Sequence, residues 1–411
     1  MKAYRIAIIG GGAAGLYLAA LLARAGVTGV AVLEKNDRCG RKLNATGNGQ
    51  GNLSNADLSL RHFHSSERDV LASRLGDPAD QTCLSLFEAL GIPLDADPSG
   101  KLYPLSRQAS CLTDSLRLCA GSGGIEEICG FEVSAIRPDA EGFSLRSSAG
   151  RTIRAGIAVC CFGGAAAPSF GTDGRSYALL EALGHHRTPI APSLVQLKTD
   201  PALPRTLKGI KVPAEVTVLD DGRATAKSRG DLLFCDYGVS GSAVFNVSGA
   251  ASEALLAGRE VRLSLDLLPQ KDRTWLTRVL FEQRERLCEY PTENFLSGVF
   301  HKTLFRMVLK HFGFRRERCG DFTDGELYKL ADLFRALPLA VRGTAGFSSA
   351  QVTKGGFLLS EFDEDLQSRL VPGLYAAGEL LDADGDCGGY NLHFAWLSAR
   401  KIGEKLIRTL A

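Results

Sequence analysis

The sequence predicts an α/β protein in which a Rossmann-like dinucleotide-binding domain is interrupted by an inserted domain that is first β-rich and then helical. Three observations support this fold class. A glycine-rich turn follows an apolar strand almost at the start of the chain, the sequence pattern changes near residue 192, and a strand, loop and helix pattern returns after residue 342. A C-terminal strand and helix can complete an N-terminal sheet, so we expect the nucleotide domain to be discontinuous.

Residues 5–34 have the pattern of a βαβ unit that binds a dinucleotide. The apolar strand leads into Gly10-x-Gly12-x-x-Gly15, whose glycines allow a sharp turn and let a pyrophosphate approach a helix N-terminus. The second strand ends at Glu34, where a carboxylate can accept hydrogen bonds from both hydroxyls of an adenosine ribose. Because strand, helix, second strand and acid all occur in order, we expect a dinucleotide site here.

Apolar runs and turn residues predict the elements of the nucleotide domain, residues 1–191 and 343–411. The expected strands are 5–9, 29–33, 131–136, 143–147, 157–162, 357–359 and 373–377. The expected helices are 13–25, 80–90, 174–183 and 391–410.

We expect the inserted domain to span residues 192–342, with a β-rich part over 192–268 and a helical part over 269–342. The turn Asp220-Asp221-Gly222-Arg223 is typical of a β-hairpin. In the helical part, Asp272 is expected to cap a helix that runs through Cys288. A second helix is expected to begin with the capping box Thr323-x-x-Glu326.

Composition favours some classes of protein over others. The 411 residues include 48 Lys and Arg against 46 Asp and Glu, so the balance gives no support for a nucleic-acid partner or an anionic membrane surface. The 11 cysteines form no Cys-x-x-Cys pair, and we expect reduced thiols, no metal site and a cytoplasmic location. Cys160 and Cys161 lie in an apolar run and are expected in the core. We expect no signal peptide and no membrane span.

A second polar, glycine-rich loop over residues 40–55 favours FAD over NAD as the dinucleotide. Its glycines allow close backbone approach to a flat ligand, and Arg41 and Lys42 could neutralise a pyrophosphate. A plain NAD domain does not need this loop, whereas a dinucleotide that lies extended across the domain does.

Another segment that we expect to contact FAD lies near the end of the chain. A strand that ends in Gly378-Glu379 can present a carboxylate to a ribityl chain. Gly388-Gly389 leads into the last helix, whose N-terminal N–H groups would face the pyrimidine edge of a flavin and stabilise negative charge on its reduced form. Asn391 suits the cap or first turn of that helix, with or without a ligand.

Over essentially its whole length the chain resembles a bacterial family of FAD-dependent oxidoreductases. The family includes the bile-acid-inducible flavoprotein, a 3-dehydro-bile-acid Δ4,6-reductase, and sequences labelled aminoacetone oxidase family FAD-binding enzymes. The resemblance rests on Gly10 to Gly15, Gly40-Arg-Lys42, Thr46-Gly-Asn-Gly49, Asn52 to Asn55, Gly163-Gly164, Gly238-Val-Ser-Gly241, Val352-Thr-Lys-Gly-Gly356 and Gly373-Leu-Tyr through Gly389-Tyr-Asn391-Leu. It implies a two-dinucleotide-binding-type FAD domain whose insert covers the flavin. Departures from the family pattern occur at Gln50-Gly51, Cys161-Phe162, Cys235-Asp236 and His393.

The motifs and the resemblance together give a set of expected FAD-binding residues. They are Gly10, Gly12, Ala14, Gly15, Glu34, Lys35, Arg41, Lys42, Thr46, Gly49, Asn52, Val133, Gly163, Gly378, Glu379, Asp384, Gly388, Gly389 and Asn391. A flavin accepts hydride without protein help, so the chain needs mainly to orient the substrate and to move one proton. Asp236, Tyr237 and His393 have suitable chemistry, although each also suits a structural role as a turn residue, a packed aromatic and a helix-face residue.

The leading hypothesis is therefore an FAD-dependent reductase of an activated C=C bond in a small, bile-acid-like, steroid-like or other enone substrate. NADH or NADPH would be the electron donor and would bind transiently, because the chain has no second Gly-x-Gly-x-x-Gly unit. The alternatives are a flavin oxidase or amine oxidase, a non-catalytic FAD-binding redox sensor, and an RNA-modifying flavoenzyme, for which the balanced charge offers little support.

Overall fold

The structure is a computed structural model that describes residues 2–76 and 82–410. The chain divides into two compact units. Unit 1 holds the described residues of Met1–Ile190 and Gln351–Ala411, and unit 2 holds Ala191–Ala350.

Unit 1 is built on a sheet whose central strands are parallel. The order is β7 (Glu126–Ile128), β2 (Val30–Leu33), β1 (Lys2–Ile9) and β10 (Thr152–Cys160). The carboxyl half of β10 pairs in parallel with β19 (Leu374–Ala376). Its amino half pairs with β9 (Gly142–Ser147), which continues the sheet to β8 (Val133–Asp139). Because β1, β2, β10 and β19 run in parallel, the loops that leave their carboxyl ends share one edge of the sheet.

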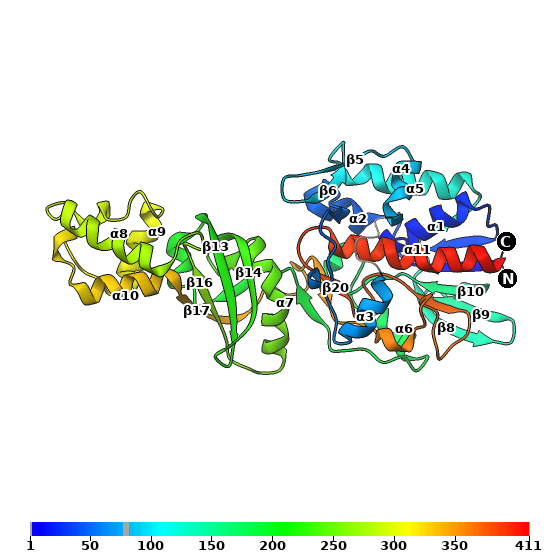
Figure 1. Ribbon diagram of the computed structural model, residues 1–411. Helices are drawn as coiled ribbons and strands as arrows, with labels where there is room; N and C mark the ends of the chain where they lie inside the picture. The colour runs from blue at the N-terminus through cyan, green and yellow to red at the C-terminus, as the bar shows by residue number, and fades with distance from the viewer. Residues whose placement is uncertain (1, 77–81, 411) are drawn as a thin grey trace. The chain divides into compact units, whose positions relative to one another are not determined.

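Three helices of unit 1 pack side by side (Figure 1). The first, α1 (Ala13–Arg24), packs against both α5 (Ala109–Ser122) and α11 (Tyr390–Leu410). Glycines allow the close approach, because a β-carbon at Gly123 would lie 2.5 Å from the Ala23 β-carbon and one at Gly403 would lie 2.6 Å from Leu21 Cδ2. The C-terminal segment thus belongs to the same core as the N-terminal strand.

Short elements complete unit 1. They are α2 (Arg41–Ala45), β3 (Ser54–Asn55), β4 (Phe63–His64), α3 (Arg68–Leu75), α4 (Ser85–Ala89), β5 (Leu94–Ala96), β6 (Lys101–Pro104), α6 (Tyr177–Glu181), β18 (Val352–Lys354) and β20 (Asp384–Gly385).

Unit 2 contains a closed antiparallel barrel and a group of helices. The barrel order is β12 (Leu197–Thr199), β15 (Gly238–Ser240), β14 (Arg223–Cys235), β13 (Lys211–Asp220), β16 (Val261–Asp266) and β17 (Leu337–Thr344). The remaining elements are β11 (Ala191–Ser193), α7 (Ser242–Leu256), α8 (Arg273–Arg286), α9 (Lys302–His311) and α10 (Asp324–Arg335). Of these helices, α7 packs on β13 and β14.

Local sequence signals explain several boundaries in unit 2. The β13–β14 hairpin turns through Asp221 at φ 45° and Gly222 at φ 82°, the two positive angles of a type I′ turn. Asp272 caps α8 by accepting a hydrogen bond from Trp275 N at 2.7 Å. Thr323 and Glu326 form the expected capping box of α10. These three predictions are confirmed.

Other expectations differ from the structure. The predicted strand at 357–359 is wrong: Phe357 makes only isolated bridges, and Leu359–Glu361 forms a 3-10 turn. The predicted helix 174–183 is confined to α6, and the strand 157–162 begins earlier, at Thr152. Of the predicted helix 80–90, positions 80 and 81 lie outside the described residues, and the rest is a 3-10 turn, Thr82–Leu84, followed by α4.

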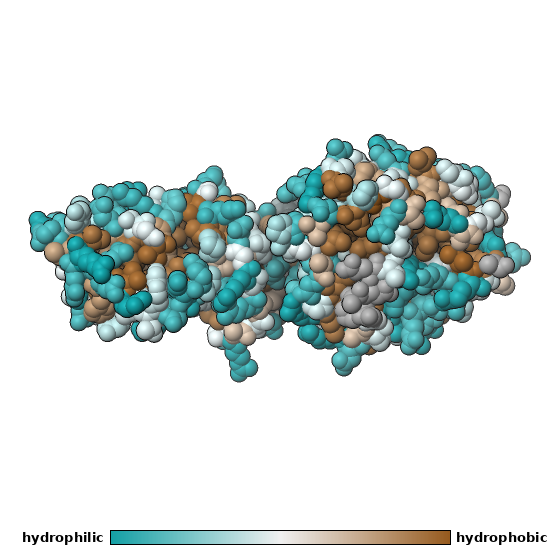
Figure 2. Space-filling model, turned by 45° about the horizontal axis from the view of Figure 1, so that its top comes forward, coloured by the Kyte–Doolittle hydropathy of each residue, from teal (hydrophilic) through white to brown (hydrophobic). Residues whose placement is uncertain are grey.

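Polar side chains cover most of the face that Figure 2 presents, with hydrophobic patches between them. Among the described residues, no helix is long and apolar enough to cross a membrane.

Candidate functional site

The glycine-rich turn after β1 brings backbone atoms too close together for side chains. A β-carbon at Gly10 would lie 2.5 Å from the Cys161 carbonyl oxygen, and one at Gly15 would lie 2.0 Å from the Gly10 carbonyl oxygen. At Gly12, the residue that precedes α1, a β-carbon would meet no atom within 4 Å. The space in front of the helix N-terminus is therefore open, and the first-turn N–H groups of α1 are available to an anion there.

Glu34 lies at the carboxyl end of β2 and is 8% exposed. Its Oε2 accepts a hydrogen bond from Gly11 N at 2.9 Å, and its Oε1 accepts from Asn36 N at 2.8 Å and from Asn36 Nδ2 at 2.7 Å. The carboxylate thus holds the glycine-rich turn against the end of β2. Each oxygen can accept more than one hydrogen bond, so ribose hydroxyls can still bind beside these donors.

Lys42, Glu379 and Thr353 meet at the carboxyl edge of the sheet, although they are far apart in the sequence. Lys42 Nζ lies 2.6 Å from Glu379 Oε2, with both side chains about four-fifths buried. Glu379 Oε1 accepts from Thr353 N at 2.9 Å, and Thr353 Oγ1 accepts from Ala165 N at 2.8 Å. A β-carbon at Gly164 would lie 2.3 Å from Thr353 Oγ1, which explains the glycine there. The loops after β10 and β19 are thereby joined to α2.

The turn before α11 is held by asparagines. Asn55 Nδ2 donates to the Gly388 carbonyl oxygen at 3.0 Å. The Asn52 amide, with its oxygen toward the turn, accepts from Gly389 N at 3.1 Å. Asn391, in the first turn of α11, accepts from Gly385 N at 2.9 Å and donates to the Gly385 carbonyl oxygen at 2.8 Å. The segment 52–55 therefore fixes the Gly388–Gly389 turn at the N-terminus of α11.

Asp384 is a buried carboxylate in β20, 4% exposed, and its Oδ1 has no hydrogen-bond partner in the described structure. Lys354 Nζ lies 3.7 Å from that oxygen. Burial raises the pKa of Asp384 to about 6, while the Lys354 charge acts in the opposite direction. Because a buried acceptor is costly to leave unbonded, this oxygen is suited to accept a hydrogen bond from a ligand.

The other predicted cofactor residues occupy varied positions. Gly378 lies against α1, since a β-carbon there would be 3.3 Å from the Ala14 β-carbon. Arg41 donates to Asn36 Oδ1, Lys35 pairs with Asp173, Thr46 donates to the Leu43 carbonyl oxygen, and exposed Gly49 adopts φ 83°. Gly163 adopts φ 73°, and its β-carbon would lie 3.9 Å from Glu379 Oε2. Val133 is buried at the start of β8, two residues after Phe131, whose N–H donates to the Glu34 carbonyl oxygen.

The three candidate catalytic residues have different surroundings. His393, in α11 of unit 1, is 2% exposed, and its Nδ1 lies 2.9 Å from Ser54 Oγ. Asp236 is exposed in unit 2, and its hydrogen bond with Lys208 holds its pKa below the usual range. Tyr237, beside it, is 38% exposed, and partial burial raises its pKa to about 12. Tyr237 therefore combines a phenol that is protonated near neutral pH with a side chain that solvent reaches.

Sequence reasoning did not single out Thr353 and Lys354 as site residues. Both lie in the segment Val352-Thr-Lys-Gly-Gly356, whose glycines were the available signal. Gly355 has φ 82°, and a β-carbon at Gly356 would lie 2.5 Å from the Leu380 carbonyl oxygen. The segment is thus pressed against the loop after β19, close to Glu379.

Comparisons with known proteins place the chain in a family. A family model described as the HI0933-like protein Rossmann domain matches residues 4–405. The chain is 34% identical to a 3-dehydro-bile acid delta(4,6)-reductase of Clostridium scindens over 97% of this chain and 98% of the relative. It is 28% identical to a ribosomal RNA dihydrouridine synthase of Escherichia coli over 99% of each chain.

A solved structure supports the fold alone. The structure of a 3-ketosteroid delta1-dehydrogenase from Sterolibacterium denitrificans aligns over the full length of both chains with a TM-score of 0.51 at 13% identity. The predicted fold class, enzyme class and flavin cofactor are confirmed at the level of the family. The chain belongs to the HI0933-like Rossmann family and is an FAD-dependent oxidoreductase.

Proposed function

We propose that this chain reduces a C=C bond conjugated with a carbonyl group in a small, steroid-like molecule, with NADH or NADPH as a transient electron donor. The observation that supports the proposal most strongly is the 34% identity, over nearly the full length of both chains, to a protein named 3-dehydro-bile acid delta(4,6)-reductase. That name describes reduction of double bonds in a 3-oxo bile acid.

The residues at the carboxyl edge of the sheet fit FAD. The open space before Gly12 suits the pyrophosphate, and the Glu34 carboxylate suits the adenosine ribose. The Lys42–Glu379 pair and the unbonded Asp384 oxygen would contact the ribityl and flavin parts. The Gly388–Gly389 turn would place the N-terminus of α11 near the pyrimidine edge. We assign the remaining expected residues to the same site.

When bound, FAD would carry the two electrons and deliver them with one proton, as a hydride. Reduction of the C=C bond then needs a second proton, on the carbon next to the carbonyl. Of the three candidates, we propose Tyr237 as the proton donor, because its side chain is partly exposed and its phenol is protonated at neutral pH. Asp236 stays ionised beside Lys208 and would not donate a proton at neutral pH. His393 is buried in α11 and its Nδ1 lies 2.9 Å from Ser54 Oγ, so we assign it to holding α11 against the segment 52–55.

A second candidate activity follows from the 28% identity to a ribosomal RNA dihydrouridine synthase. The C5=C6 bond of uracil is also conjugated with a carbonyl group, so the chemistry would be the same and only the substrate would differ. An RNA substrate would need a basic surface, and the near balance of 48 basic and 46 acidic residues favours the small molecule.

A single-turnover experiment separates these candidates. The purified protein is reduced anaerobically and divided among a 3-oxo-4,6-diene steroid, the corresponding saturated 3-oxo steroid, and ribosomal RNA that lacks dihydrouridine. The proposal expects the flavin to be reoxidised only by the dienone, with a product heavier by two hydrogens. Reoxidation by RNA alone would support the second candidate. Reoxidation only by oxygen would point to an oxidase, and no reoxidation by any of them would favour a redox sensor.

A further inference from the structure

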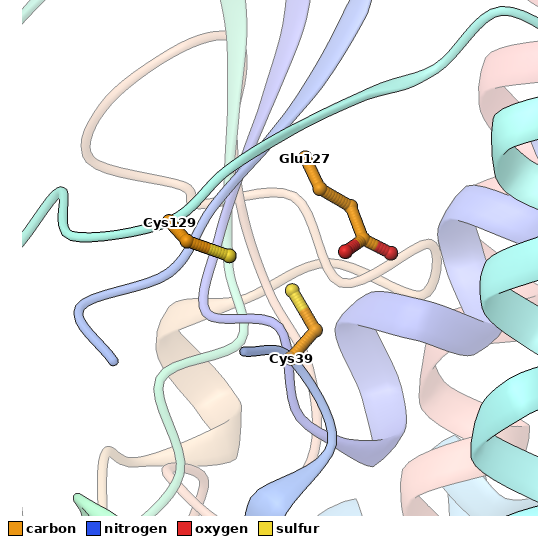
Figure 3. Close-up of side chains that lie close together, drawn as sticks. All are labelled: Cys39, Glu127 and Cys129. Carbon is orange, nitrogen blue, oxygen red and sulfur yellow. The ribbon is translucent and has the colours of Figure 1, made fainter. Parts of the chain in front are cut away.

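A cluster of metal-binding side chains lies in unit 1, outside the proposed catalytic residues. Cys39, Glu127 and Cys129 bring two sulfur atoms and a carboxylate oxygen within 4.8 Å of one another (Figure 3). Cys39 precedes α2, Glu127 lies in β7, and Cys129 directly follows β7. Cys39 is fully buried, and the other two side chains are partly exposed.

The backbone explains why these side chains converge. Glu127 and Cys129 are two residues apart along an extended strand, so their side chains point to the same face of the sheet. Next to them β2 pairs with β7, and the segment after β2 brings Cys39 to this edge of the sheet. Gly40, with a φ of 82°, then turns the chain into α2. A β-carbon at Gly11 would lie 2.4 Å from Cys39 Sγ. The thiol of Cys39 therefore rests on the backbone of the glycine-rich turn.

The charges around the cluster suit a divalent cation. Arg117, from α5, makes a bidentate ion pair with Glu127, with N–O distances of 2.7 to 3.0 Å. A divalent cation and the Arg117 guanidinium together would neutralise two thiolates and the Glu127 carboxylate. The neighbouring carboxylate of Glu34 is already bonded to Gly11 and Asn36. The ligand set would then be close to neutral in a partly buried place, which a buried site requires.

We propose that Cys39, Glu127 and Cys129 bind one Zn²⁺ ion, with a water molecule as the fourth ligand. Two thiolates and one carboxylate are ligands that Zn²⁺ accepts in tetrahedral geometry. Zn–S bonds of about 2.3 Å put two sulfurs roughly 3.8 Å apart, so small side-chain rotations close the observed cluster onto the ion. Each thiol binds as a thiolate, and uptake of one Zn²⁺ therefore releases two protons to solvent.

The ion would tie the edge strand β7 to the segment that leads into α2, and through Cys39 it would support the Gly11 turn. Bound Zn²⁺ should therefore stabilise unit 1 and slow the release of FAD. The competing occupant of this place is a Cys39–Cys129 disulfide.

The test uses the FAD-loaded full chain, kept reduced with a phosphine and stripped of metal with a chelator. Titration with Co²⁺, which reports thiolate ligands by charge-transfer absorption, is followed by displacement with Zn²⁺. We expect one equivalent of Co²⁺ with thiolate absorption and tetrahedral d–d bands. Cys129→Ser and Cys39→Ala should each weaken binding by more than about 100-fold, beyond the effect typical of an outer-shell partner.

Matched variants keep the result interpretable. Cys288→Ser removes an exposed thiol of unit 2 and should leave the absorption unchanged. Glu127→Gln keeps the thiolate absorption and should weaken binding. If Cys39→Ala fails to fold, the more exposed Cys129→Ser still decides the matter. Absence of thiolate absorption in the wild type, its survival in Cys129→Ser, or a Cys39–Cys129 disulfide recovered from freshly purified protein would each overturn the proposal.

Discussion

Gly15 and Gly12 offer a test that separates the stability of the turn after β1 from its use as a binding site. Gly15 lies inside α1, where alanine would normally stabilise a helix by about 1 kcal/mol. Here a β-carbon would lie 2.0 Å from the Gly10 carbonyl oxygen, so the helix and the turn must separate by more than about 1 Å to restore an ordinary contact. Overpacking costs about 1–3 kcal/mol, and a clash of this size with a backbone atom belongs to the upper end of that range. After subtraction of the helix gain of about 1 kcal/mol, we expect a net loss of roughly 1–2 kcal/mol in Gly15→Ala.

Gly12→Ala should behave in the opposite way. A β-carbon there meets no protein atom within 4 Å, and the residue has an ordinary φ of −85°. The unfolding free energy of the apoprotein should therefore change by less than about 1 kcal/mol. The methyl group would occupy the space assigned to the pyrophosphate, so FAD affinity should fall at least roughly tenfold, or about 1.4 kcal/mol.

The assay follows unit 1 alone. The chain has 2 tryptophans, of which Trp396 is buried in α11 and Trp275 lies in α8 of unit 2. In a Trp275→Phe background, urea unfolding of the apoprotein monitored by fluorescence reports unit 1, and FAD titration gives the affinity. Gly121→Ala in α5, with no atom near its β-carbon, is the control and should stabilise by up to about 1 kcal/mol. A Gly15→Ala apoprotein at least as stable as the wild type would rule out the steric role of Gly15, and unchanged FAD affinity in Gly12→Ala would rule out a pyrophosphate next to Gly12.

Three further predictions concern carboxylates of the same site. Glu34→Ala should lower FAD retention markedly, measured as flavin per chain after gel filtration; full occupancy would remove the ribose assignment. A double-mutant cycle with Lys42→Met and Glu379→Gln should give a coupling of about 0.5–3 kcal/mol in unfolding free energy, and strict additivity would count against their ion pair. Asp384 holds its proton more tightly when folded, because burial raises its pKa to about 6, and this contribution is lost as the pH rises through 6. Asp384→Asn should therefore match the wild-type apoprotein in stability near pH 4 and exceed it by roughly 1–3 kcal/mol near pH 7.5, whereas a difference independent of pH would contradict the assignment.

Local signals made much of the fold predictable. The βαβ unit follows from glycines whose requirement is steric and from a strand order that places Glu34 beside the turn. The β13–β14 turn and the caps of α8 and α10 depend on residues within four positions of one another. Such short-range chemistry is visible in a single sequence.

Contacts between distant segments were not predictable in the same way. The sequence did not indicate α5, whose buried Leu112, Leu116 and Ala120 form only a narrow apolar stripe. The Lys42–Glu379 ion pair joins residues 337 positions apart, so motifs could propose both residues without placing them together. The Cys39–Cys129 cluster has no signature in the spacing of the cysteines, because its side chains meet only through the pairing of β2 with β7.

This chain is an FAD-dependent oxidoreductase, and we propose that it holds FAD at the carboxyl edge of its sheet. The most direct measurement is the visible absorbance spectrum of the purified protein, before and after anaerobic addition of NADH and then NADPH. We expect an oxidised flavin spectrum that bleaches with one of the two donors and returns when a dienone is added. A protein that shows no flavin spectrum, even after incubation with FAD, would contradict it.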